Sequence, residues 1–345
     1  GVKIMPTPTY NLGKIIVGNA DAAAEAYKKF VNQPIDLEML NNGPYPYSMK
    51  KTTIANSAYV TGPGTFLGSQ TSTLNFFPCQ DDGWWIDRTD QIEQFPIKVS
   101  VRNVWTTARN IVLRSGCPHN YLRMVEHIIA MRMGMGLDNL LIRTDSGDPP
   151  LFDKGNYDIY EALEEAEIVE TDQPAEFVTV REPVTFSGER GDFLTFIPAE
   201  PGQYGLRVDC AIKFQSSIGE QRILFDMTPE TFKIGAAART NAPFSTYLFT
   251  KTIGKLFADT RNLGYTTKNI LIHGKKKYFN EAKLVFEGKS LEAVWHRATL
   301  DLLAAVALID TGRFAGTIVS YRAGHTQDVR MATMLYLKDY LVPHK

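Results

Sequence analysis

Cysteine is scarce in this sequence and follows no pairing pattern. The 345 residues contain three cysteines, Cys79, Cys117 and Cys210, and no two of them form a C-x-x-C pair. An odd, scattered set argues against a disulfide framework, and the missing C-x-x-C pair argues against a cysteine zinc site. The sequence therefore favours a reducing compartment, such as the cytoplasm or an organelle interior.

Long apolar runs and an excess of charge are also missing. Leu302 to Ile309 is the kind of short apolar run found in a protein core, well below the roughly 18 residues that span a bilayer. The formal net charge is −1, so no overall field attracts nucleic acid or anionic membranes. The N-terminal stretch GVKIMPTPTYNLG has no signal-peptide pattern. We expect a soluble chain with no transmembrane segment and no nucleic-acid partner, and its compartment stays unknown.

The sequence contains two successive blocks in which strand patterns precede helical ones. The first has the strand-like segments TTIANSAYVTG, STLNFFPC, GWWIDR and FPIKVSVRNVW, then HNYLRMVEHIIAMRMGMG with apolar residues at helical spacing. After an acidic, turn-rich linker at TDQPAE, the second block has the alternating strand YGLRVDCAIKF and the predicted helices TYLFTKTIGKLFADTRNLG, 290–310 and DVRMATMLYLKDYL. The order predicts an α+β fold of two similar two-layer domains, over 50–165 and 175–340.

The first 49 residues form a separate N-terminal extension in this interpretation. NADAAAEAYKKFV predicts a short helix, and NNGPYPYSMKK is rich in turn residues. The segment has too few apolar residues for a core of its own.

The stretch AVWHRATLDLL, within the predicted helix 290–310, carries His296, Arg297 and Asp301. His296 and Asp301 are five residues apart, which places them about 140° out of register on an α-helix. Arg297 and Asp301 are four apart and share a face. The pair His296 and Asp301 is therefore a poor metal site on a regular α-helix.

Several segments resemble, in order, the zinc-dependent UDP-3-O-acyl-N-acetylglucosamine deacetylases of lipid A synthesis. MVEHIIAMRMGMGLDN resembles that family's helix with T-V-E-H and G-L-G-I-D-N. Further matches between Lys50 and Leu337 are GPGTFLGS, GWWIDRTD, PLFDKGN, ARTNAPF, LGYTTKNILI and YRAGH. Each segment alone is weak evidence, but the ordered series is specific and leaves out only the N-terminal extension.

The resemblance implies two similar domains with the active site in a cleft between them. It implies a zinc ion held by His127, by Asp301 and by a histidine of an H-K-x-L-D helix. It further implies Glu126 as general base, His325 as an assisting cation or acid, and Thr240 as the residue that stabilises the oxyanion.

Several positions of the implied site differ from the family pattern. Anchored on Leu300 and Asp301, the alignment puts Arg297 where the family has its second zinc-binding histidine, and His296 in the neighbouring arginine position. Ala298 then replaces the basic residue that follows the ligand. Phe66 replaces a histidine of the first-domain turn, and we expect the Phe66 side chain to pack in the core. Asn241 replaces a phenylalanine of the family pattern.

Three interpretations of these differences stay open. Arginine offers no lone pair to a metal, so Arg297 is expected to pair with Asp301 in place of the lost ion, leaving His127 and Asp301 as a remnant site. Alternatively, Arg297 and Asp301 lie on a solvated helix face. In the third, a π-bulge turns His296 onto the Asp301 face and keeps the zinc.

Two functions follow from these interpretations. The favoured one is a catalytically degenerate deacetylase homologue without a cofactor, acting as a binding or structural subunit of a larger assembly and docking through residues 1–48. The alternative is an active zinc amidohydrolase acting on a UDP-linked, acylated amino sugar. Fold alone does not choose between them.

Overall fold

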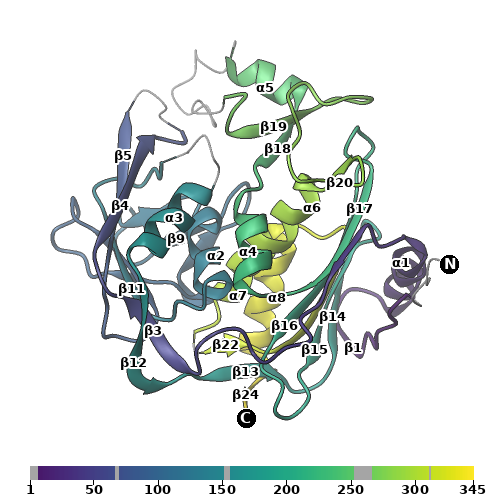
Figure 1. Cartoon of the computed structure of the whole chain (residues 1–345), viewed down its shortest axis with the longest axis horizontal. Coiled ribbons are helices and arrows are strands. Elements are labelled where there is room, and N and C mark those ends of the chain that lie inside the picture. Colours follow the sequence, from purple (N-terminus) through teal and green to yellow (C-terminus); the bar gives the residue numbers. More distant parts are fainter. Residues whose placement is uncertain (1–6, 67–69, 151–155, 252–265, 311) are drawn as a thin grey trace.

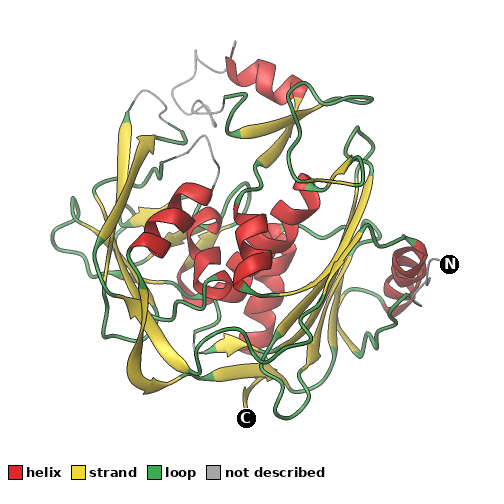
Figure 2. Ribbon diagram, in the orientation of Figure 1, coloured by secondary structure: helices red, strands yellow, loops and turns green. Residues whose placement is uncertain are grey.

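The central helices lie between two sheets (Figures 1 and 2). A computed structural model of the chain describes residues 7–66, 70–150, 156–251, 266–310 and 312–345. One sheet has five strands in the order β4-β5-β11-β6-β7, and the other has seven in the order β1-β14-β15-β23-β16-β17-β2. The remaining strands form smaller sheets of two or three strands. The predicted α+β class with two sheet-and-helix layers is confirmed.

The first half of the chain builds the five-stranded sheet and two of the helices. Its elements are β3 (Lys50–Ile54), β4 (Ala58–Pro63), β5 (Thr71–Phe77), β6 (Trp84–Arg88), β7 (Ile97–Lys98), a 3₁₀ turn (Val101–Asn103), β8 (Val104–Thr106), β9 (Val112–Arg114), β10 (Tyr121–Leu122), α2 (Glu126–Gly134), β11 (Leu140–Thr144) and α3 (Tyr157–Glu165).

The second half builds most of the seven-stranded sheet and the other central helices. Its elements are β12 (Ile168–Pro174), β13 (Phe177–Val180), β14 (Val184–Ser187), β15 (Phe193–Pro198), β16 (Leu206–Lys213), β17 (Glu220–Asp226), α4 (Pro229–Ala236), β18 (Thr240–Pro243), α5 (Phe244–Lys251), β19 (Ile270–His273), β20 (Val285–Phe286), β21 (Lys289–Ser290), α6 (Glu292–His296), a π turn (Arg297–Asp301), α7 (Leu302–Ala307), β22 (Arg313–Phe314), β23 (Gly316–Tyr321), α8 (His325–Leu337) and β24 (Leu341–His344).

Two predicted elements differ at their ends from those in the structure. The helix expected from about residue 121 begins only at Glu126, because Tyr121 and Leu122 pair with β9 and Met124 adopts a left-handed backbone (φ 52°). The expected strand FPIKVSVRNVW is interrupted at Ser100, whose hydroxyl accepts the Arg102 N–H (3.1 Å) and starts a 3₁₀ turn. The helix predicted over 246–264 is α5 up to Lys251, and its remainder lies outside the described residues.

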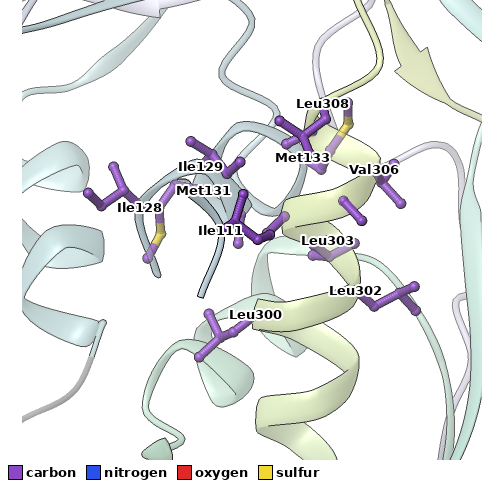
Figure 3. Close-up of a cluster of buried hydrophobic side chains, with 14 of the residues drawn as sticks. Ile111, Ile128, Ile129, Met131, Met133, Leu300, Leu302, Leu303, Val306 and Leu308 are labelled. Carbon is purple, nitrogen blue, oxygen red and sulfur yellow. The ribbon is translucent and has the colours of Figure 1, made fainter. Parts of the chain in front are cut away.

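The core is densest where α2 packs against α7. Figure 3 shows α2 residues, among them Ile129 and Met133, beside α7 residues such as Leu303 and Val306. Arg132 ties the C-terminal ends of the two helices together, donating to the carbonyls of Ala307 (2.5 Å) and Ile309 (2.8 Å). These contacts fix the start of α2 relative to the π turn, and both of those segments carry cleft residues. Among the described residues, no helix is long and apolar enough to cross a membrane.

The N-terminal segment is not a separate arm but part of the seven-stranded sheet. It supplies β1 (Lys14–Val17) to one edge and β2 (Leu37–Met39) to the other, each parallel to its neighbour. Between them α1 (Ala20–Asn32), the predicted helix, lies on the sheet face opposite the central helices (Figure 1). There it buries Ala26 and Phe30 against Phe193, Ala211, Val319 and Tyr321. The segment thus supplies both edge strands of the sheet and covers part of its outer face.

A buried ion pair locks this segment to the sheet. Arg222 and Asp209 are both fully buried and joined by two hydrogen bonds (2.9 and 2.8 Å). Arg222 also donates to the carbonyls of Phe30 (3.0 Å) and Gln33 (2.8 Å), and the Tyr10 hydroxyl donates to Asp209 (2.8 Å). The charged pair therefore has part of its hydrogen bonding completed by the N-terminal segment.

Replacing Tyr10 with phenylalanine should test this lock. The change removes one hydrogen bond to a buried carboxylate, so we expect the free energy of unfolding to fall by about 1.5–3 kcal/mol. Chemical denaturation measures the loss. Tyr59→Phe is the matched control, since Tyr59 is 68% exposed and should change stability little. Equal, negligible effects of the two substitutions would contradict the proposed lock.

Candidate active site

A cleft of about 1060 Å³ is lined by residues from both halves of the chain. The first half contributes the start of α2 and the loop before it, and the second half contributes β18, the π turn and the start of α8. All the residues for which the sequence implied a catalytic or metal-binding role line this cleft: Glu126, His127, Thr240, His296, Asp301 and His325.

Glu126 and His127 are placed by the first turn of α2. The N–H of Ile111 donates to Glu126 Oε2 (2.9 Å), which holds one carboxylate oxygen in place. Burial raises the pKa of Glu126 to about 8, and the negative charge of Asp301 also raises it. His127 Nδ1 lies 2.8 Å from Asn156 Oδ1, so Nδ1 carries the proton and Nε2 keeps its lone pair for the cleft.

The π turn brings His296 and Asp301 together. It lies between α6 and α7, and the N–H of Leu302 bonds to the carbonyl of Arg297, five residues earlier. Each turn of a π-helix holds more residues than a turn of an α-helix, so residues five apart come onto one face. His296 Nδ1 is accordingly 3.8 Å from Asp301 Oδ2. The π-bulge, the third interpretation of the sequence, is therefore present.

Two imidazoles converge on one hydroxyl group. Thr240 Oγ1 lies 3.4 Å from Nε2 of His127 and 3.2 Å from Nε2 of His296, and the two ring centroids are 5.5 Å apart. Burial and, to a smaller extent, the neighbouring His296 lower the pKa of His127 to about 4, and burial also lowers the pKa of His296. Both rings are thus neutral near pH 7, the form that binds metals.

Arg297 points away from this cluster, contrary to the expected pairing with Asp301. Its guanidinium forms a bidentate ion pair with Asp328 on α8, with Nη2 2.7 Å from Asp328 Oδ1. It also donates to the carbonyl of Ala323 (2.6 Å). The prediction was wrong because it assumed an α-helix, on which Arg297 and Asp301 would share a face; the π turn gives Asp301 to His296 instead.

The other predicted positions fall in different places. Ala298 is fully buried in the core and does not line the cleft. With His296 in the cleft, the basic residue that follows the histidine is Arg297. Phe66 packs against the apolar cluster of Met124, Ala242, Ile270 and Ile272, as the core interpretation expected. His325 begins α8, and its Nε2 donates to the carbonyl of Thr107 (2.9 Å).

The sequence analysis did not single out two of the polar partners of the cleft residues. Asn156 fixes His127 from the loop before α3, and Asp328 neutralises Arg297. Asn156 lies in PLFDKGN, a segment that was noticed only for its resemblance. Asp328 had a usable signal, since a carboxylate three residues after His325 lies on the same face of a helix.

The cleft also offers cationic and apolar surfaces beyond this cluster. Besides Arg297, five of its lining residues are lysine or arginine: Arg109, Arg190, Lys213, Arg322 and Arg330. Among the described residues, the guanidinium groups of Arg109, Arg190 and Arg322 form no ion pair. Met124 belongs both to the lining and to the apolar cluster with Phe66. The arrangement suits a ligand with an anionic part and an apolar part.

Comparison with known proteins identifies the family. The sequence model of UDP-3-O-acyl N-acetylglycosamine deacetylases matches residues 51–337. The chain belongs to this deacetylase family. UDP-3-O-acyl-N-acetylglucosamine deacetylase of Bdellovibrio bacteriovorus is 29% identical over 276 residues, covering 79% of this chain and 85% of that protein. The Campylobacter curvus protein of that name is 29% identical (78% and 88% covered), and the Brucella ovis protein 26% (79% and 90%).

The matched region begins at residue 51, so the first 50 residues lie outside it. Those residues include both edge strands and the helix that the N-terminal segment adds to the seven-stranded sheet. The N-terminal segment, which supplies both edge strands of this sheet, therefore lies outside the part matched by the family model.

Proposed function

We propose that this deacetylase-family chain is an active zinc-dependent enzyme that hydrolyses the N-acetyl group of a UDP-3-O-acyl-N-acetylglucosamine. Water adds to the acetyl carbonyl carbon, the C–N bond breaks, and acetate and a free amine are released. The supporting observation is the π turn, which sets His296 beside Asp301 and turns its Nε2 toward the Thr240 hydroxyl that also meets Nε2 of His127.

The donor chemistry fits zinc. Two neutral imidazoles and one carboxylate are a common set of protein ligands in catalytic zinc sites, with the remaining position left for water or substrate. His127, His296 and Asp301 would hold the ion, and Asn156 would fix the ring of His127 from behind. When bound, zinc supplies an activated water and polarises the acetyl carbonyl.

The remaining polar residues have roles that follow from their positions. Glu126 has one oxygen fixed by Ile111 and lines the cleft. The positive charge of bound zinc would lower its raised pKa, and the ionised carboxylate would then be placed to take the proton of the attacking water. The Thr240 hydroxyl, between the two imidazoles, donates to the developing oxyanion. His325, oriented by the Thr107 carbonyl, assists departure of the amine.

The substrate class follows from the two further surfaces of the cleft. The basic lining residues suit the diphosphate, because guanidinium groups bind phosphate oxygens with directed, charge-assisted hydrogen bonds. Met124, which lines the cleft and belongs to the buried apolar cluster with Phe66, offers an apolar contact that suits the acyl chain. An acylated sugar nucleotide has both features.

One observation favours the competing proposal, a non-catalytic subunit that docks onto other proteins. No group of three His, Cys, Asp or Glu side chains within the described ranges is arranged to hold a metal ion as it stands. In the proposed enzyme His127, His296 and Asp301 would hold zinc, with the Thr240 hydroxyl beside both imidazoles. Elemental analysis therefore separates the two proposals.

Purified protein should contain close to one zinc per chain and release acetate from UDP-3-O-acyl-N-acetylglucosamine. Chelation should remove both zinc and activity, and added zinc should restore them. Protein that binds no zinc after incubation with the metal, and shows no turnover while remaining folded, would establish the non-catalytic alternative.

A further inference from the structure

Glu292, the first residue of α6, forms a buried ion pair that the proposed chemistry does not use. Its side chain is fully buried and contacts Arg239, which is 3% exposed. Two hydrogen bonds join them, from Nε to Oε1 (2.7 Å) and from Nη2 to Oε2 (3.0 Å). Neither residue lines the cleft, but the residue that follows each of them in the chain, Ala293 or Thr240, does. The pair therefore lies directly behind the cleft wall.

The Glu292 carboxylate holds main-chain atoms as well as the guanidinium. Oε1 accepts the backbone N–H of Arg239 (3.3 Å), and Oε2 accepts the backbone N–H of Lys283 (3.0 Å). Arg239 Nη2 donates in turn to the carbonyl of Glu281 (2.7 Å). The carboxylate thus fixes the backbone of the residue that immediately precedes Thr240.

Thr240 needs such a link because its strand lies apart from the two large sheets. β18 begins at Thr240 and pairs with β19 in a two-stranded parallel sheet, separate from the five-stranded and seven-stranded sheets. That ladder fixes Thr240 relative to β19, whereas the cleft histidines lie on the central helices. The Glu292 carboxylate connects a central helix to the chain one residue before Thr240.

The same helix carries one of the two imidazoles that meet Thr240. Glu292 and His296 are four residues apart, so they lie one turn apart on the same face of α6. The first turn holds the backbone of Arg239, and the last residue places Nε2 of His296 at 3.2 Å from Thr240 Oγ1. The two contacts of α6 thus reach adjacent residues of the chain.

We infer that Glu292 is a positioning residue, which anchors Arg239 and thereby holds the Thr240 hydroxyl beside His296. The inference rests on the proposed function, in which Thr240 donates to the developing oxyanion. Such a donor is effective when it is fixed in place before the reaction. A misplacement of roughly 1 Å can lower a rate about 100-fold. Glu292 therefore acts on kcat through Thr240, without touching the substrate.

A double-mutant cycle with Thr240, read out as acetate release, tests this role. Glu292→Gln removes the charge and one acceptor oxygen, and should lower kcat roughly 10- to 100-fold with KM changed by less than about twofold. Thr240→Ala should lower kcat by on the order of 100-fold or more. Because Glu292 acts through the Thr240 hydroxyl, adding Glu292→Gln to Thr240→Ala should lower kcat by less than about twofold further. Effects that simply multiply would overturn the inference.

Asp138→Asn is the matched control. Asp138 forms a largely buried bidentate pair with Arg313 (3.0 and 2.7 Å), and neither residue lines the cleft. Its substitution should also destabilise the fold by leaving an arginine without its counter-ion, but should change kcat by less than about twofold. Equal losses of kcat in Asp138→Asn and Glu292→Gln would mean that the Glu292 pair is merely structural. Glu292→Asp keeps the charge on a side chain one methylene shorter, and should lower kcat even if Glu292→Gln fails to fold.

Amide hydrogen exchange separates this inference from the proposed function. Glu292→Gln should speed exchange of the Arg239 amide much more than Asp138→Asn does, because the amide then loses its charged acceptor. If this pattern appears but the wild type releases no acetate, the proposed function fails while the anchor before Thr240 stands. Unchanged exchange at Arg239 would overturn the anchor whether or not the protein is active.

Discussion

Replacing His296 with alanine should remove tightly bound zinc and lower kcat/KM by on the order of 100-fold or more. Loss of a residue behind a metal ligand already costs about 10- to 100-fold in affinity or activity, and His296 would contact the ion directly. Its Nε2 lies 3.2 Å from Thr240 Oγ1, and its Nδ1 lies 3.8 Å from Asp301. Zinc content after dialysis, together with acetate release, measures both effects.

His119→Ala is the control for this experiment, because His119 is exposed and does not line the cleft. It should leave zinc content and turnover unchanged. The result also decides between two alignments of the helix. If Arg297 held the ligand position and His296 faced elsewhere, His296→Ala would be as silent as His119→Ala, and the proposed zinc site would be wrong.

The fold class could be predicted because its signals are local and repeated. The alternation in β16 buries Val208, Cys210 and Ile212 on the face toward the helices, and the ordered family segments fix the sequence of elements. The role of the N-terminal segment could not be predicted from its composition. Its Phe30 is buried against Phe193 and Tyr321, which lie far along the chain, so the apolar residues that complete its core are not its own.

The sequence predicted which segments line the candidate site, but it did not predict which of two neighbouring residues, His296 or Arg297, faces Asp301. His127, Thr240, Asp301 and His325 line the cleft as their segments implied. The predicted pairing of Arg297 with Asp301 was wrong because it assumed 3.6 residues per turn, whereas a π turn holds one extra residue. The π turn packs closely against α4: a Cβ at Gly235 would lie 2.2 Å from Thr299 Oγ1. Sequence spacing contains no record of that contact.

The π turn also explains why an arginine, Arg297, can follow His296 in the chain. Arg297, the first residue of the π turn, contacts α8 and β23, where Asp328 is fully buried and Ser320 accepts a hydrogen bond at 3.2 Å from Nη2. The pair joins the helix that carries His296 to the helix that His325 begins. Arg297 thus supports the geometry of the cleft rather than standing in for a lost ion.

Replacing Arg297 with methionine should therefore cost about 3–5 kcal/mol in the free energy of unfolding, because it leaves the Asp328 carboxylate buried without its counter-ion. The double variant Arg297→Met with Asp328→Leu should recover most of the loss, since a well-packed apolar pair needs no hydrogen bonds. Arg207→Met is the matched control: it breaks a comparable pair with Asp226 (2.7 Å), but Arg207 is 43% exposed and the cost should stay below about 1 kcal/mol. Denaturant unfolding of the four proteins, wild type included, gives these energies. A small loss for Arg297→Met, with no recovery in the double variant, would mean that the pair with Asp328 does not hold the two helices together.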